Sequence, residues 1–335
     1  MINTTPKLIM VSSLNWQRLF GMFAAFFLLL PLSHYSSGQV GLADVELSIT
    51  PVAGNVYMIQ RPGGGGNIGV QLGPDGVLLI DSLFAPLTEK VVAAVAQVTE
   101  EEIRFLVNTH IHIDHVGGNA NLADKGVLIF SHDNTRLRFL EERSHFPRAG
   151  GSFVPQQPTA ARPPITFNDT LNFHLNGEEV RACKVPPAHT DGDIFVYFPE
   201  SDVMHLGDVY RTTSYPIIDV YNGGTLRGTV AAMDIAIDIA GPETKVIPGH
   251  GLEVVGREEL IEFRDMILDI QRQVLNLIRE GKKFHDVIAA QPTAAYDAKW
   301  TDDPGWGPAD FIPVVYYQLG GGGRLADRGT DSASY

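Results

Sequence analysis

A short run of polar residues places three histidines and an aspartate within six positions, and this run constrains the fold more than any other feature. The run at residues 109–119 reads THIHIDHVGGN and directly follows the apolar segment Ile103–Val107, which is typical of a buried strand. The polar side chains therefore lie where a strand ends in a loop, and functional groups commonly project from such places. Neutral imidazole and carboxylate are the ligand set of zinc and similar divalent ions, whereas a simply solvated loop seldom concentrates histidine in this way. The run predicts a metal site.

Composition limits how such a site is built. The 335 residues, 44% of them hydrophobic, are enough to bury a large core, as one large domain or two smaller ones. A net charge of -14, with no cluster of lysine and arginine, argues against a nucleic-acid partner. Cys183 is the only cysteine, which excludes an intramolecular disulfide and a cysteine-rich metal site. Histidine and carboxylate must therefore supply the metal ligands.

The first 38 residues have the pattern of an export signal. Lys7 and Arg18 lie in an N-terminal stretch without acidic residues, before an apolar run at 20–32 and the small residues at 36–38. We predict a signal peptide at residues 1–38 and a periplasmic or secreted mature protein. The apolar run is short for a membrane span, and no cysteine follows it for lipid attachment. An uncleaved membrane anchor stays open as the alternative.

Alternating and apolar runs divide the next part of the chain into strands and helices. We predict strands at residues 45–50, 54–60, 68–72, 77–81, 103–107 and 126–131. Helical spacing predicts helices at 86–97, 117–125 and 133–142, the last capped by Asp133. The order strand, helix, strand over residues 77–107 is a βαβ unit, so part of the sheet is parallel. Residues 144–164 lack periodicity, and this long loop either covers a site or is a surface insertion.

The second half of the chain again mixes strands with helices, which predicts a layered α/β protein. Strands are expected at 166–175, 178–185, 193–198, 203–206 and 245–247, and helices at 225–239, 257–279, 283–290 and 309–319. The amphipathic helix at 257–279 belongs to a helical C-terminal extension at 256–320, which follows a main domain at 39–255. The polar, glycine-rich tail at 321–335 is expected to be disordered.

Three further stretches place a metal-binding residue type at a strand end or in a loop. They are Pro187–Asp193 with His189, Leu206–Val209 with Asp208, and Pro248–Gly251 with His250. Each has glycine or proline beside the polar residue, as expected where the backbone bends to direct a ligand.

Together with the run at 109–119, these stretches resemble the metallo-beta-lactamase superfamily, in the right order and over nearly the whole mature chain to about residue 255. The resemblance implies a four-layer αββα sandwich with metals at one edge of its two sheets, and makes residues 39–255 the catalytic domain. It also implies two zinc ions, with iron or manganese as alternatives. One ion would be held by His110, His112 and His189, the second by Asp114, His115 and His250, with Asp208 bridging both. Alternate residues of an extended segment point the same way, which agrees with the pairing of His110 with His112.

The resemblance implies a hydrolase in which a metal-bridging hydroxide attacks the carbonyl of an ester, thioester, lactone or amide. Asp114 would be the catalytic residue that orients the hydroxide and transfers a proton to the leaving group. Asp208 is typical of glyoxalase II-like enzymes and generally absent from class B beta-lactamases, although residues 248–251 lack the Glu-Tyr continuation of the glyoxalase group. A class B beta-lactamase and a mononuclear iron persulfide dioxygenase are the alternatives. We expect a small-molecule substrate and no protein partner.

Other polar residues have two interpretations each. Asp81, at a strand end, either bonds to the ligand loop or caps the helix that starts near Pro86. Arg211 either binds a substrate carboxylate or forms a surface salt bridge. His132 either supports the ligands or is an ordinary polar residue, and Cys183 is expected to be packed in a strand.

Overall fold

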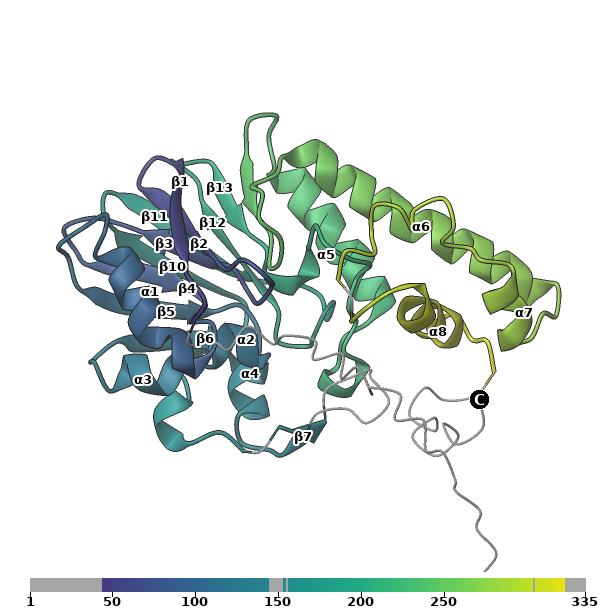
Figure 1. Cartoon of the computed structure of the whole chain (residues 1–335), viewed down its shortest axis with the longest axis horizontal. Coiled ribbons are helices and arrows are strands. Elements are labelled where there is room, and N and C mark those ends of the chain that lie inside the picture. The colour runs from purple at the N-terminus through teal and green to yellow at the C-terminus, as the bar shows by residue number, and fades with distance from the viewer. Residues whose placement is uncertain (1–43, 145–152, 155, 304, 323–335) are drawn as a thin grey trace, which may run out of the picture. The chain divides into compact units, whose positions relative to one another are not determined.

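The computed structural model describes residues 44–144, 153–154, 156–303 and 305–322 (Figure 1). By its contacts the chain divides into residues 1–39 and residues 40–335, and every described residue belongs to the second part. The predicted signal peptide at 1–38 lies outside the described residues, as do residues 145–152 of the predicted loop and 323–335 of the predicted tail. In the part that the structure describes, no helix is both long and apolar enough to cross a membrane.

Two β-sheets form the centre of the fold. The first has seven strands in the order β1 (Ser48–Ala53), β2 (Val56–Gln60), β3 (Ile68–Gln71), β4 (Val77–Ile80), β5 (Ile103–Asn108), β6 (Leu128–His132) and β9 (Ile165–Phe167). The second has five, in the order β10 (Thr170–Leu175), β11 (Glu178–Lys184), β12 (Ile194–Phe198), β13 (Val203–His205) and β14 (Lys245–Ile247). A separate short pair joins β7 (Arg143–Ser144) to β8 (Phe153–Val154).

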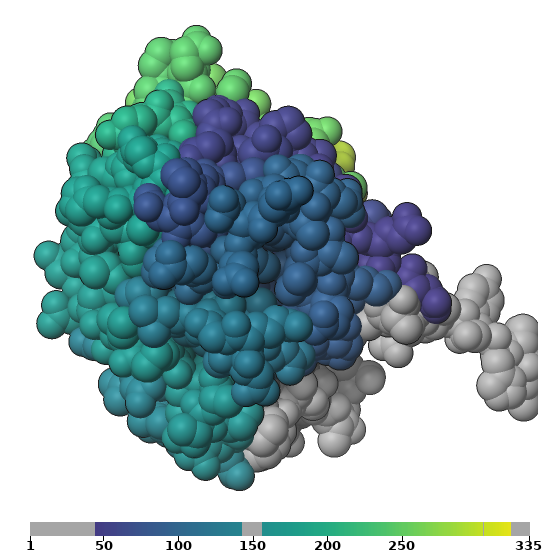
Figure 2. All heavy atoms as spheres, turned by 90° about the vertical axis from the view of Figure 1, so that its left-hand side faces the viewer, coloured from purple at the N-terminus to yellow at the C-terminus, as the bar shows by residue number. Residues whose placement is uncertain are grey.

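The two sheets pack face to face because successive side chains of a strand point to opposite faces of its sheet, and the central strands carry apolar side chains on both faces. In β4, Leu78 and Ile80 belong to the cluster between the sheets, whereas Val77 and Leu79 belong to the cluster on the outer face. From the second sheet, alternate residues of β12 such as Val196 enter the same inner cluster. Figure 2 shows the consequence on one face of the molecule, where residues of the first half, in blue, lie against those of the second half, in teal.

Helices cover the outer face of each sheet. The helix α1 (Thr88–Val95), with the 3-10 turn η2 (Ala85–Leu87), packs on the first sheet. The helices α5 (Leu226–Ile239), α6 (Arg257–Arg279), α7 (Phe284–Ala289) and α8 (Pro308–Gln318) share one apolar cluster with residues of the second sheet; within it α6 packs on α5, and α7 packs on α6 and α8 (Figure 1). The predicted four-layer αββα arrangement with C-terminal helices is confirmed.

Parallel pairing brings the ends of several strands to one edge. The strands β4, β5 and β6 are parallel neighbours, as predicted from the βαβ unit, so their carboxyl ends lie side by side. In the second sheet, β13 and β14 are also parallel, and they lead to Asp208 and His250. The loops that carry the predicted ligands therefore meet at one edge.

Local structure departs from prediction near this edge. The run at 109–119 contains the short helix α2 (Ile113–Val116), which was not expected, and it ends where α3 (Asn119–Ala123), which was expected, begins. The helix α4 (Asp133–Arg138) is four residues shorter than predicted at its C-terminal end. The predicted cap Asp133 is wrong: it is already helical, and Nδ1 of His132 accepts the backbone N–H of Asn134 instead. The imidazole provides an acceptor where an aspartate was expected.

Candidate metal centre

Asp81 fixes the start of the ligand loop. It follows β4 with φ 71°, and its carboxylate accepts bonds from the backbone N–H of Thr109 at 2.7 Å and from the Thr109 hydroxyl at 2.6 Å. Oδ2 also lies 2.7 Å from Nδ1 of His115. The η2 turn has no side-chain cap, so Asp81 does not cap the helix that starts near Pro86. Of the two interpretations of Asp81, the one in which it bonds to the ligand loop is therefore correct.

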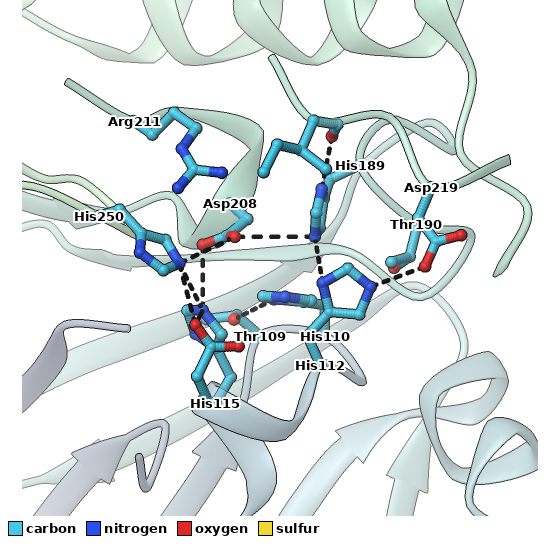
Figure 3. A network of polar contacts seen from close by, with 12 residues as sticks. Thr109, His110, His112, His115, His189, Thr190, Asp208, Arg211, Asp219 and His250 are labelled. Carbon is cyan, nitrogen blue, oxygen red and sulfur yellow. Dashed lines mark hydrogen bonds and ion pairs between the residues drawn. The ribbon is translucent and has the colours of Figure 1, made fainter. Parts of the chain in front are cut away.

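A first group of ligand atoms comes from both sheets. His110, His112, His189 and Asp208 each offer one atom, and these atoms all lie within 4.8 Å of one another (Figure 3). Nδ1 of His112 and Nε2 of His189 are 2.8 Å apart. Nε2 of His110 is buried and has no hydrogen-bond partner among the described residues. The buried imidazoles of His110 and His189 and the partly buried ring of His112 thus converge on one point, where a cation would satisfy nitrogen atoms that otherwise face each other.

A second group lies beside the first and contains Asp114, His115 and His250. Nε2 of His250 lies 3.2 Å from Oδ2 of Asp114 and 3.4 Å from Nε2 of His115. The Asp208 carboxylate stands between the two groups, with Oδ1 3.0 Å from Nε2 of His115 and Oδ2 3.8 Å from Nε2 of His189. The structure brings all seven predicted ligands together, in two groups with the predicted membership, although His110 and His115 also form a third group with Asp81.

Outward-facing nitrogens of the imidazoles are also bonded. Nε2 of His112 lies 2.7 Å from the buried carboxylate of Asp219, and Nδ1 of His189 donates to the carbonyl oxygen of Ile217 at 2.6 Å. Such contacts decide which nitrogen faces a metal ion and hold the ring in place. Sequence reasoning missed Asp219 and Ile217, because neither lies in a motif.

Two glycines leave room for the ligands. A Cβ atom on Gly66, in the loop between β2 and β3, would lie 2.6 Å from Cε1 of His115. On Gly249 it would lie 2.2 Å from Oδ1 of Asp208. Any larger residue at either position would displace a ligand atom.

Two imidazoles of the first group, those of His110 and His189, have a lowered pKa. Burial lowers the pKa of His110 well below its usual value, and the nearby His115 and His189 lower it further. Burial, followed by the proximity of His112, lowers the pKa of His189 to about 3. Both rings are therefore neutral near pH 7, as a metal ligand must be.

In the second group, carboxylates and imidazoles hold each other in charged forms. Burial is the largest single influence on His115 and His250 and lowers their pKa, but Asp208 and Asp114 together with their hydrogen bonds exceed it, so the pKa of both is raised. Burial likewise opposes ionisation of Asp208 and Asp114, yet the two histidines lower the pKa of each carboxyl. Protons thus supply the positive charge that a bound cation would provide. The donor set and its electrostatics fit two divalent cations.

Arg211 lies beside the second group, and it is buried. Figure 3 shows its side chain on the same side of the centre as His250 and Asp208. Its Nη2 donates to Asp303 at 3.3 Å, whereas Nε and Nη1 have no hydrogen-bond partner among the described residues. The expected salt bridge is present, to Asp303, but it does not lie on the surface, because the guanidinium is withdrawn from solvent and keeps unused donors.

Two other histidines lie close to the strand ends without joining the groups. His132 contacts Asn134 and, through Nε2, the carbonyl oxygen of Asn168. His205 is buried, and its Nδ1 accepts the backbone N–H of Gly207. This bond fixes the residue before Asp208.

Comparisons with known proteins agree with this geometry. A sequence profile described as the metallo-beta-lactamase superfamily matches residues 49–251. The chain is 23% identical over 245 residues to a linear primary-alkylsulfatase from Pseudomonas sp., covering 62% of this chain and 46% of that protein. It is 23% identical over 233 residues to the 2,4-dinitroanisole O-demethylase subunit alpha from Nocardioides sp., covering 68% and 65%. With a metallo-beta-lactamase type 2 from Bacillus cereus it shares 20% identity over 193 residues, covering 57% and 69%. The chain thus spans less than two thirds of the first two relatives.

Solved structures show the same fold. A metallo-beta-lactamase from Pontibacter korlensis superposes with a TM-score of 0.56 at 18% identity, covering 67% of this chain and 100% of that one. A variant of the sec-alkyl sulfatase PisA1 superposes with a TM-score of 0.63 at 18% identity, covering 82% and 50%.

Proposed function

Since the chain belongs to the metallo-beta-lactamase superfamily, we propose that it is a dinuclear zinc hydrolase that cleaves an ester, thioester, lactone or amide at its carbonyl carbon. The observation that carries this proposal is the position of Asp208, whose two oxygens face imidazoles of both groups. A carboxylate between two sets of ligands is suited to bridge two cations, and zinc accepts imidazole and carboxylate in such sites.

Each group would hold one ion, with Asp208 shared. When bound, two such ions lower the pKa of a water molecule that they share and polarise a carbonyl group beside them. The imidazole orientations that this needs are already set by Asp81, Ile217 and Asp219, which bond the outward nitrogens of three ligands.

Asp114 is the residue proposed to move a proton. Its side chain is 20% exposed, so it is the carboxylate of the second group that a substrate reaches from solvent. Its lowered pKa keeps it ionised against the effect of burial, through His115 and His250. An ionised Oδ2 accepts a hydrogen bond from the attacking water and then transfers the proton to the leaving group.

Arg211 is proposed to bind an anionic part of the substrate. Its buried Nε and Nη1 lack partners among the described residues, and it lies next to the second group. A buried guanidinium with unused donors is strongly stabilised by an oxoanion, which accepts charge-assisted hydrogen bonds. The preferred substrate therefore carries a carboxylate or a similar group.

A second candidate is the hydrolysis of alkyl sulfates. The observation in its favour is the similarity to alkylsulfatases, which extends over 62% of this chain in sequence and 82% in fold. A sulfate group would also suit Arg211. A class B beta-lactamase is the weaker alternative, because Asp208 takes the place where such enzymes generally lack a carboxylate.

The proposal includes export, with a signal peptide at residues 1–38 and a small-molecule substrate met outside the cytoplasm. Cell fractionation and N-terminal sequencing of the mature protein test this part. A protein that stays in the cytoplasm with its N-terminus intact would contradict it.

Metal analysis and a substrate screen test the function. The purified protein is expected to contain about two zinc ions per chain. It should hydrolyse at least one of nitrocefin, a homoserine lactone, a thioester, a phosphodiester or an alkyl sulfate, and lose that activity with a chelator. An alkyl sulfate as the sole substrate would favour the second candidate. One iron per chain with oxygen uptake would instead identify a dioxygenase and overturn the proposal.

A further inference from the structure

One loop supports several parts of the metal centre. Residues 211–218, here called the support loop, join the bridging residue Asp208 to Asp219. The loop begins with Arg211, and near its end the carbonyl oxygen of Ile217 accepts the Nδ1 proton of His189 at 2.6 Å. A shift of this loop would therefore move a ligand of the first group.

The C-terminal extension holds the support loop along its length. The backbone N–H of Tyr215 donates to the carbonyl oxygen of Trp300 at 3.2 Å, and Ser214 forms an isolated antiparallel bridge with Thr301. The Tyr215 hydroxyl donates to Asp297 at 2.7 Å. These partners lie beyond residue 251, where the match to the superfamily profile ends.

One contact of the extension lies a single peptide unit away from the carbonyl group that bonds the proposed ligand His189. Nε1 of Trp306 donates to the carbonyl oxygen of Pro216 at 3.2 Å, and both atoms are buried. The next carbonyl along the chain is that of Ile217, which bonds His189. Loss of the indole N–H would leave the buried carbonyl oxygen of Pro216 without a hydrogen-bond donor. Because an unpaired buried carbonyl costs free energy, this loss favours rotation of the backbone at Pro216. That rotation would misplace the Ile217 oxygen and release the His189 ring.

We propose that Trp306 is a positioning residue for the metal ion held by His110, His112 and His189, and that it acts through the backbone of Pro216 and Ile217. The proposal rests on the dinuclear centre of the proposed function. It assigns to the C-terminal extension a part in metal binding, in addition to its packing on α5.

Trp300 provides a matched comparison. It lies six residues before Trp306, and both side chains are 2% exposed. It holds the support loop through its backbone carbonyl, which a substitution of the side chain keeps. Its ring packs on Phe263. Trp300→Phe therefore changes core packing by about as much as Trp306→Phe but leaves every bond to the loop in place.

The experiment compares wild type, Trp306→Phe and Trp300→Phe as full-length metal-free proteins. Zinc binding is measured by competition with a chromophoric chelator, and cobalt(II) spectra report the geometry of the first site. In Trp306→Phe we expect the affinity of the first site to fall about tenfold relative to Trp300→Phe, with an altered cobalt spectrum. The affinity of the second site and the melting temperature of the metal-free protein should match those of Trp300→Phe.

Equal affinity of the two variants for the first ion would overturn the proposal. If Trp306→Phe does not fold, Trp306→Tyr replaces it, since the phenol fills more of the buried site and still removes the indole N–H that bonds Pro216. That variant is expected to lose the same affinity, and wild-type affinity in it would overturn the proposal. The wild-type titration is read separately: failure to bind two ions counts against the dinuclear function, whereas the comparison of variants concerns Trp306 alone.

Discussion

Asp219 and His112 form a contact in which Oδ2 of the buried carboxylate lies 2.7 Å from Nε2 of the imidazole. The contact turns Nδ1 of His112 towards His189 and the other ligands of the first group. Asp219 is itself held by the backbone N–H groups of Tyr221 and Asn222. The orientation of one proposed ligand thus depends on a residue 107 positions away.

Replacing Asp219 tests this dependence. Asp219→Asn is expected to weaken zinc binding at the first group by about 10- to 100-fold, because the amide is a poorer acceptor for the imidazole N–H. Chelator competition measures the effect. The control is Asp202→Asn, which alters a carboxylate that accepts from Thr244 and touches none of the proposed ligands. If both variants bind zinc like the wild type, the contact has no role in metal binding.

The seven proposed ligands were predictable because their signals are local. The run at 109–119 follows a recognisable strand, and His189, Asp208 and His250 each have glycine or proline nearby. Parallel pairing then brings the strand ends together without further information. The fold was predictable for a similar reason. Side chains of a strand such as β4 point alternately to its two faces, and apolar residues on both faces indicate that both faces are covered.

The surroundings of the ligands were not predictable, because they depend on loop conformation. Asp219 and Ile217 reach their histidines only through the path of residues 211–222, which has no periodic pattern. Arg211 is buried because Asp303, 92 positions later, lies beside it. Contacts of this kind arise from tertiary packing, on which local propensity carries no information.

The bridging role of Asp208 predicts a change in metal content. Asp208→Asn is expected to reduce bound zinc from about two ions to about one per chain, because the amide lacks the charge needed between two cations. Elemental analysis after dialysis measures this. Thermal melting provides a second readout, since fewer bound ions stabilise the folded state less. Two tightly bound ions in the variant would show that Asp208 does not bridge.

Acid should release the two ions in a defined order. Asp208 raises the pKa of His115 and His250 against the effect of burial, so protons compete for these nitrogens as the pH falls through the raised values. The pKa of His189, lowered to about 3 mainly by burial, leaves that ring unprotonated at the same pH. The ion of the second group therefore leaves first on acidification. Zinc release, measured against pH with a zinc-binding dye, should show two steps. Cobalt spectra should assign the step at higher pH to the ion of the second group. Release of the first-group ion at the higher pH would contradict the assignment.

Arg211 should matter only for anionic substrates. Arg211→Met is expected to raise KM about tenfold or more for a substrate with a carboxylate or sulfate, because a charge-assisted hydrogen bond is lost. For a neutral ester of similar size, KM should change little. Arg211→Lys should recover part of the loss, and Arg181→Met, which alters an exposed arginine paired with Glu179, serves as the control. An equal rise in KM for neutral and anionic substrates would mean that the residue acts on the site as a whole.

Gly66 shows how closely the first sheet approaches the second metal group. A Cβ atom there would lie 2.8 Å from Nε2 of His115, the nitrogen that faces Asp208 and His250, and 2.7 Å from the carbonyl oxygen of Asp114. The His115 ring cannot move away from such an atom without breaking its contact with Asp81, which lies on the other side of the ring.

Gly66→Ala is therefore expected to push His115 out of line and to weaken binding of the second ion by at least about tenfold, while the first group keeps its affinity. Metal titration followed by cobalt absorption separates the two sites. Gly307→Ala is the control, since its φ of -142° suits any residue and no atom lies within 4 Å of the added carbon. Wild-type affinity at both sites in Gly66→Ala would show that the loop moves aside at little cost, and that the close approach of Gly66 does not shape the metal centre.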